Sequence, residues 1–158
     1  MLVDIETLSI VIAAVTVVVG VIYSSLQLRE QTRSRHTDLV MRLYDKFSSD
    51  EFQDAWYRVR TSDIKKLTNV LDQPKELFQS MNQVCLFFEG VGILLRRGIT
   101  DVRMIDDLFG ETVIRAWELM KTTVDGARQQ LNDPEVYYCF EFLYDEMKKR
   151  EQLAHSAS

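Results

Sequence analysis

The chain carries one long stretch without charge, LSIVIAAVTVVVGVIYSSLQL, which runs from Leu8 to Leu28. At about 1.5 Å per residue, a helix of these 21 residues is long enough to cross a hydrocarbon core of roughly 30 Å. In lipid every backbone N–H needs a partner within the segment, and a lone span achieves this only as a helix. The stretch therefore predicts a transmembrane helix over residues 8–28.

Two other kinds of segment share some features of this stretch. A buried core helix can be apolar along its length, but a run of this length favours a span. A cleaved signal peptide needs a basic start, a shorter apolar run and a small-residue cleavage site. Here Asp4 and Glu6 precede the run, and no basic side chain does. Both alternatives fit the sequence less well than a membrane span.

Basic residues follow the predicted span directly, at Arg29, Arg33 and Arg35. The positive-inside rule then places Met1 outside and the chain from Arg29 onward in the cytosol. The same three arginines are candidates for contact with anionic lipid headgroups, and a topology signal alone is the other interpretation. The sequence thus predicts a single-pass protein of the cytoplasmic (inner) membrane, with its cysteines reduced in the cytosol.

Small side chains recur along one face of the predicted span. Ser9, Ala13, Thr16, Gly20 and Ser24 are spaced four, three, four and four residues apart. Small residues let two helices approach closely, so this stripe is a candidate contact surface for a partner helix. Because small residues are common in all spans, the alternative is a face that meets only lipid.

The composition limits the number of domains and the kinds of binding site that the chain can have. With 158 residues, 46% of them hydrophobic, the protein has room for one compact domain plus one extra element. Its net charge of -5 gives no overall attraction to nucleic acid, so no nucleic-acid partner is expected. Cys85 and Cys139 are too few and too far apart for a disulfide framework or a zinc site.

The segments after the span follow helical spacing. Residues 29–47 are rich in polar side chains and contain neither Gly nor Pro, which predicts a juxtamembrane stalk helix. No window in residues 48–152 alternates with period two for long enough to be a convincing strand, so this part is expected to be a cytosolic helical bundle and the fold class all-α. Residues 1–7 form a short extracytoplasmic N-terminus and residues 153–158 a flexible tail. Apolar residues at helical spacing predict helices in the second half of the stalk and in the bundle. These helices cover residues 39–47, 52–59, 64–71, 77–95, 102–108, 113–124 and 134–150.

Some of these helix ends have recognisable signals. Gly98 follows two arginines at the end of the 77–95 helix, as is usual at a helix C-terminus. Asp101 can cap the next short helix, and Gly110 is expected to close it. Asp133 followed by Pro134 predicts an N-cap with proline at the first helical position.

The chain shows no recognisable catalytic set. His36 and His155 lie far apart in the sequence, and Cys85 and Cys139 fall on apolar helix faces. Metal sites need clustered donors, and nucleophilic catalysis needs a base beside the nucleophile. No glycine-rich phosphate loop is present either. The sequence therefore predicts a protein that is not an enzyme and that has no metal or cofactor.

Two carboxylates stand in apolar surroundings, Glu89 in the segment LFFEGVG and Glu141 in the segment YCFEFL. A carboxylate on a core helix must face outward or be paired, and Arg115 and Arg128 are the possible partners. One interpretation is a set of buried ion pairs that fixes the register of the helices. The other is a polar pocket that senses an anion or a proton.

Several short motifs resemble a family of small, uncharacterised prokaryotic membrane proteins that is known only as a domain of unknown function. The resemblance implies one N-terminal span and a helical cytosolic domain over nearly the whole chain, and it implies no activity. The motifs are Phe88-Glu89 with Gly92, Arg97-Gly98, Asp107-Leu108-Phe109-Gly110, Trp117-Glu118, and Pro134 with Phe140-Glu141 and Leu143.

The leading functional hypothesis is a non-enzymatic, membrane-anchored interaction protein. It would be an accessory or regulatory subunit of a larger membrane complex, or a self-assembling scaffold. Its partners would be membrane lipid and either an integral-membrane protein or further copies of the chain. The alternative is a homo-oligomeric membrane pore or effector with a cytosolic sensing domain, although the span has few polar atoms for a wide pore. A third hypothesis, an enzyme with Glu89 or Glu141 as general base, requires a cleft and a raised pKa.

Overall fold

The computed structural model describes the backbone of residues 5–62 and 74–156, and the side chains in these ranges except those of residues 5–12, 26 and 28–36. The described residues are helical and contain no strand, which confirms the all-α class. By its internal contacts the chain divides into two units, residues 1–39 and residues 40–158.

The first unit consists of the N-terminal part of helix α1 (Ile5–Ser48). This helix passes through residues 8–28 without a break, as expected for that stretch. Among the residues whose placement is described, no helix combines the length and apolar character needed to cross a membrane. The side chains of residues 8–12, Leu26 and Leu28 lie outside those described, and the span itself stays a prediction.

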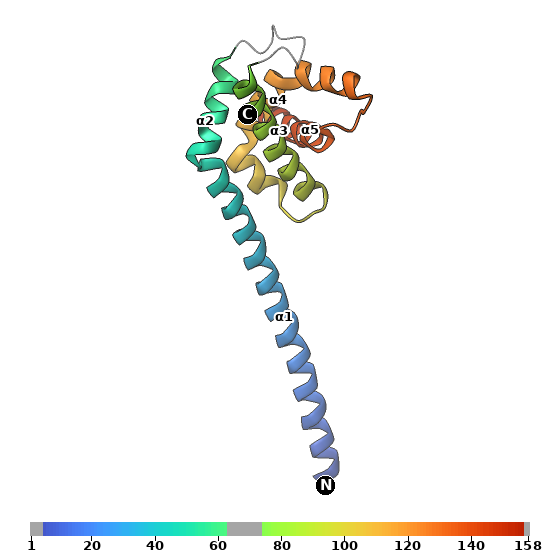
Figure 1. Ribbon diagram of the computed structural model, residues 1–158. Coiled ribbons are helices and arrows are strands. Elements are labelled where there is room, and N and C mark those ends of the chain that lie inside the picture. The colour runs from blue at the N-terminus through green and yellow to red at the C-terminus, as the bar shows by residue number, and fades with distance from the viewer. Residues whose placement is uncertain (1–4, 63–73, 157–158) are drawn as a thin grey trace. The chain divides into compact units, whose positions relative to one another are not determined.

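The second unit is a helical domain. It contains the end of α1, α2 (Asp50–Thr61), α3 (Lys75–Arg96), α4 (Val102–Leu131) and α5 (Tyr138–Ser156). Helix α3 packs against both α2 and α5, and α4 packs mainly against α5 (Figure 1). The domain begins at Val40, inside the range expected for the stalk, because Val40, Leu43 and Phe47 are turned toward the apolar interior.

Aromatic side chains form the centre of this domain. Phe52 of α2, Phe88 of α3 and Phe140 of α5 are fully buried. The Phe88 and Phe140 rings are stacked with centroids 5.2 Å apart, and Trp117 of α4 meets Phe140 edge-on at 5.0 Å. Burial of each such ring stabilises the fold by about 1.5–3 kcal/mol. One aromatic cluster therefore joins four helices.

The start of α2 follows local capping rules. The Ser49 side chain accepts a hydrogen bond from the backbone N–H of Phe52 at 3.3 Å. Asp50 and Glu51 then place negative charge in the first turn, where the helix dipole favours it. This confirms the break expected between the helices over residues 39–47 and 52–59. The short helix expected over residues 64–71 lies outside the described residues.

The prediction that Gly110 closes a helix was wrong, because α4 continues through it to Leu131. Gly110 is buried, and a Cβ there would lie 2.5 Å from Asp106 Oδ1 and 3.7 Å from Met147 Sδ. Asp106 in turn pairs with Arg150 of α5 at 2.7 Å. The glycine therefore makes room for packing between α4 and α5 and does not end a helix.

Both predicted ends of the last helix were also wrong. Asp133 Oδ1 accepts from the backbone N–H of Glu135 at 2.9 Å, which is a local cap, but α5 begins only at Tyr138. Tyr137 has a φ of 54°, which interrupts the helical path just before that point. At its other end α5 runs to Ser156, past the arginine expected to end it at residue 150.

Candidate functional site

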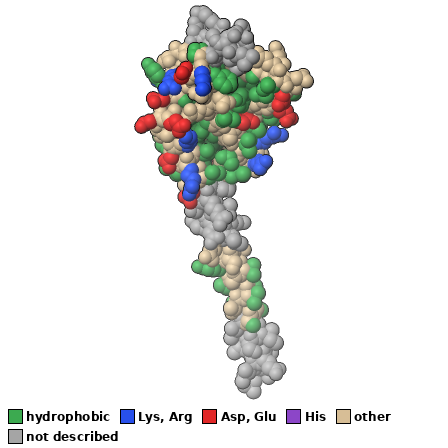
Figure 2. Space-filling model, in the orientation of Figure 1, with side chains coloured by type: hydrophobic (Ala, Val, Ile, Leu, Met, Phe, Trp, Pro, Cys, Tyr) green, Lys and Arg blue, Asp and Glu red, His purple; other side chains and the backbone are tan. Residues whose placement is uncertain are grey.

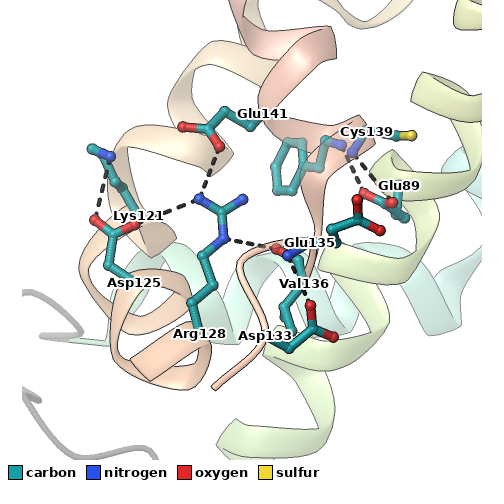
Figure 3. Close-up of polar contacts among 10 residues, drawn as sticks. Glu89, Lys121, Asp125, Arg128, Asp133, Glu135, Val136, Cys139 and Glu141 are labelled. Carbon is teal, nitrogen blue, oxygen red and sulfur yellow. Dashed lines mark hydrogen bonds and ion pairs between the residues drawn. The ribbon is translucent and has the colours of Figure 1, made fainter. Parts of the chain in front are cut away.

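The start of α5 is attached to α3 by one carboxylate. Glu89 of α3 accepts hydrogen bonds from the backbone N–H of Phe140 at 2.7 Å and from that of Cys139 at 3.2 Å (Figure 3). These N–H groups belong to the first turn of α5, where no carbonyl of the same helix can reach them. Glu89 is therefore a cap supplied by another helix, with its negative charge at the positive end of the α5 dipole.

A glycine one turn further along α3 makes this contact possible. A Cβ on Gly92 would lie 2.6 Å from the carbonyl carbon of Cys139, and closer still to its oxygen. Both atoms are backbone, so they cannot rotate away as a side chain could. The absence of a side chain at Gly92 lets α3 approach the start of α5 closely enough for Glu89 to reach its N–H groups.

A second junction is centred on Arg128, near the end of α4. Its Nη1 lies 2.8 Å from Glu141 Oε2 on α5, and its Nε donates to the carbonyl of Val136 at 2.9 Å (Figure 3). A longer pair of 3.7 Å joins it to Asp125, and its guanidinium stands 5.8 Å from the centre of the Trp117 ring. Arg128 thus ties α4, the 132–137 loop and α5 together.

The 132–137 loop takes two backbone conformations that side chains seldom adopt. Asn132 has a φ of 50° and ends α4 in the left-handed region, where asparagine is tolerated best after glycine. Tyr137 has a φ of 54°. Its hydroxyl donates to Asn82 Oδ1 on α3 at 2.6 Å. That hydrogen bond and the Arg128 contact hold the loop against the helices on both sides.

An apolar pocket lies between α3, α4 and this loop, and we name it the α3–α4 pocket. Its volume is about 330 Å³. Cys85 and Met120 contribute buried sulfur atoms 3.6 Å apart, whereas Phe78 and Leu131 are largely exposed. The lining residues are Phe78, Met81, Asn82, Cys85, Met120, Thr123, Val124, Ala127, Gln130, Leu131, Val136 and Tyr137.

The titratable groups of the pocket are uncharged at neutral pH. Burial, with a smaller contribution from the charge of Glu89, raises the pKa of the Cys85 thiol to about 12. Burial also raises the pKa of Tyr137 to about 12, assisted by Cys85 and Glu89. A thiol is nucleophilic only as thiolate, so Cys85 is chemically inert in this setting.

One polar atom of the pocket has no partner. Thr123 is 8% exposed, and its hydroxyl oxygen is buried without a hydrogen bond among the described residues. A threonine inside a helix often bonds the carbonyl four residues earlier, which this one does not do. A buried polar group without a partner costs about 1–3 kcal/mol.

The two carboxylates singled out in the sequence have different surroundings. Glu141 is paired with Arg128. The Glu141 side chain is 32% exposed and the Arg128 side chain 16%, so this pair is only half-buried. The partners of Glu89 are backbone N–H groups, not the arginine that was expected. Arg115 is exposed on α4 and is not brought to either carboxylate.

The residues predicted on the N-terminal helix occupy exposed or undescribed positions. Ala13, Thr16, Gly20 and Ser24 are exposed on α1. A Cβ at Gly20 would meet nothing within 4 Å. The side chains of Ser9, Arg29, Arg33 and Arg35 lie outside those described.

Sequence reasoning missed the α3–α4 pocket. Its polar members Asn82, Thr123, Gln130 and Tyr137 come from three separate segments and form no motif. One available signal was Asn132, since asparagine directly after an apolar helix indicates a left-handed C-terminal cap. Within the described residues, no three His, Cys, Asp or Glu side chains lie close enough together to hold a metal ion.

The helical domain thus combines two polar junctions with one uncharged pocket. Residues 5–147 match the family described as a domain of unknown function, DUF4760, and the chain belongs to that family. The match covers most of the chain and agrees with the resemblance seen in its motifs. No curated protein and no solved structure matches the chain.

Proposed function

We propose that this protein is a non-enzymatic, membrane-anchored interaction protein, an accessory subunit whose N-terminal helix lies in the cytoplasmic membrane. One observation carries the proposal: residues 13–25 of α1 are all exposed, and none of them is charged. The large side chains at Val15, Val17, Val18, Val19, Val21, Ile22 and Tyr23 are 55–67% exposed.

Lipid is the environment that suits these exposed apolar side chains of α1. A helix that is apolar all round is stable only inside a large core or a membrane. In Figure 2 the stretch of this helix between two grey segments, residues 13–25 with Gln27, shows apolar and uncharged side chains and no acidic or basic one. The charge-free run continues from Leu8 to Leu28, the length that a bilayer requires. Three arginines follow within seven residues, which favours an outside N-terminus and a cytosolic domain.

A role in binding is favoured over catalysis by the chemistry of the domain. The buried Cys85 thiol is protonated at neutral pH, and Glu89 is committed to two backbone N–H groups. The face with Ala13, Thr16, Gly20 and Ser24 would be the contact with a partner helix in the membrane, because small residues allow close approach.

Membrane fractionation of the full chain tests the anchor. We expect the protein to remain in the pellet after an alkaline carbonate wash. Val18→Arg places a charge in the middle of the run at a cost of about 2.5–3.5 kcal/mol, and should move much of the protein to the supernatant. The control is Met41→Arg, on the same helix and also exposed but beyond the run, which should leave the distribution unchanged. Equal release of wild type and both variants would contradict the anchor.

The orientation has its own test. A protease added to intact spheroplasts should remove a tag fused before Met1 and leave a tag fused after Ser158 intact. The reverse pattern would place the helical domain outside and contradict the proposed topology.

A further inference from the structure

The α3–α4 pocket has the size of a small-molecule site. Ligand sites in proteins occupy roughly 300–1,000 Å³, and this pocket has about 330 Å³. An engineered apolar cavity of roughly 150 Å³ holds a benzene molecule. The α3–α4 pocket is about twice that size, so it has room for two fused aromatic rings or an aliphatic chain of similar bulk.

The lining selects against charged ligands. None of the twelve lining residues is Asp, Glu, Lys, Arg or His. Cys85 and Tyr137 titrate only near pH 12 and supply no charge at neutral pH. A carboxylate or an ammonium group entering this space would lose its hydration without gaining an ionic partner, which costs far more than burial of an uncharged molecule.

One buried hydroxyl of the lining is unpaired among the described residues. The Tyr137 hydroxyl already donates to Asn82, whereas the Thr123 hydroxyl is buried and unpaired among the described residues. Thr123 lies on α4 next to Val124 and one turn before Ala127, all three of which line the pocket. This oxygen is enclosed in its present rotamer, so a ligand oxygen reaches it once the Thr123 side chain turns about χ1, and then accepts or donates the hydrogen bond that the protein itself does not provide.

From these observations we infer that the α3–α4 pocket is a binding site for an uncharged, mainly apolar molecule about the size of two fused rings, whose one oxygen pairs with the Thr123 hydroxyl. The site goes beyond the proposed anchoring function and does not depend on it. The partly exposed Phe78 and Leu131 give such a molecule a way in from solvent.

Equilibrium binding of 2-naphthol tests the site, with the full chain reconstituted in lipid nanodiscs and empty nanodiscs subtracted. Naphthalene has the same rings without the oxygen, and naphthalene-2-sulfonate adds a charge. We expect saturable binding of 2-naphthol at one molecule per chain. Naphthalene should bind about tenfold more weakly, because it leaves Thr123 unpaired, and the sulfonate should bind at least a hundredfold more weakly.

Three variants assign the binding to this pocket. Thr123→Val keeps the shape but removes the hydroxyl, and should bring the affinity for 2-naphthol down to that for naphthalene. Ala127→Phe fills the pocket and should abolish binding of both compounds. Gln129→Phe adds the same ring at an exposed position of α4 outside the pocket and should leave binding unchanged.

Three results would overturn the inference. One is absence of saturable 2-naphthol binding above the empty nanodiscs, in a preparation whose helical content shows that it is folded. Another is equal binding to Ala127→Phe and wild type, which would place the compound elsewhere. The last is sulfonate binding as tight as that of 2-naphthol, which would remove the uncharged class of ligand.

Discussion

The carboxylate of Glu89 on α3 lies 2.7 Å from the backbone nitrogen of Phe140 and caps the first turn of α5, 51 positions later in the chain. The same carboxylate accepts from Cys139. We expect Glu89→Ala to lower the free energy of unfolding by about 2–3 kcal/mol, because two N–H groups of a helix start lose a charged acceptor. Glu89→Gln keeps one acceptor and should cost about 1–2 kcal/mol.

Urea unfolding of the full chain in nanodiscs measures these costs through tryptophan fluorescence, since Trp56 and Trp117 are both buried in the helical domain. Glu135→Gln is the matched control, because Glu135 is an exposed carboxylate just before the same helix start. If Glu89→Gln and Glu135→Gln unfold at the same urea concentration, the cap does not stabilise the fold.

Two glycines of α3, two residues apart, should respond in opposite directions to the same substitution. Gly92→Ala pushes a methyl group into the backbone of Cys139 and should destabilise the domain by about 2–3 kcal/mol. Gly90→Ala meets nothing within 4 Å and should stabilise α3 by about 0.5–1 kcal/mol through helix propensity. Thermal unfolding of the pair measures both, and a neutral Gly92→Ala would mean that α3 and α5 are farther apart than described here.

Arg128 holds the 132–137 loop as well as α5. Arg128→Ala removes contacts to Glu141 and to the Val136 carbonyl, and should cost about 1–3 kcal/mol. Arg128→Lys keeps the charge but cannot make both contacts, so it should recover only part of that loss. Amide hydrogen exchange should quicken in residues 132–140 first. A change spread evenly over the domain would show that Arg128 does not act through the loop.

The raised pKa values of Cys85 and Tyr137 predict loss of stability in alkali. In the folded chain both groups have a pKa of about 12. In the unfolded chain the pKa is 9.0 for the Cys85 thiol and 10.0 for the Tyr137 hydroxyl. Their contribution is therefore fully present below about pH 9 and is lost as the pH rises toward 12. Cys85→Ala should flatten the fall of the melting temperature between about pH 9 and pH 11. An identical slope in wild type and Cys85→Ala would contradict a buried, protonated thiol.

The sequence was informative where the signal is local. Helical spacing was sufficient to predict α2, and the apolar face and basic end of α3 were sufficient to predict that helix. Gly110 was misread because a glycine that makes room for Met147 looks the same in sequence as one that ends a helix. The start of α5 was misread because the positive φ of Tyr137 depends on its tertiary contact with Asn82.

The candidate site could be predicted only in part. Glu89, Glu141 and Arg128 stood out because charged residues among aromatic ones need partners. Their actual partners were not predictable, since Glu89 is satisfied by backbone groups that carry no sequence signature. The α3–α4 pocket depends on three segments meeting in space, and no spacing within one segment indicates it.

The most direct test of the central claim is mild detergent extraction of the protein from native membranes, followed by mass determination of the intact particle. The 18.4 kDa chain should be recovered with an integral-membrane partner in fixed ratio. Gly20→Leu fills the small-residue face and should release the partner from the chain. Val18→Leu preserves the apolar surface and should leave the complex intact. Recovery of a lone monomer, or of the same particle from wild type and Gly20→Leu, would contradict an accessory subunit that binds through this helix.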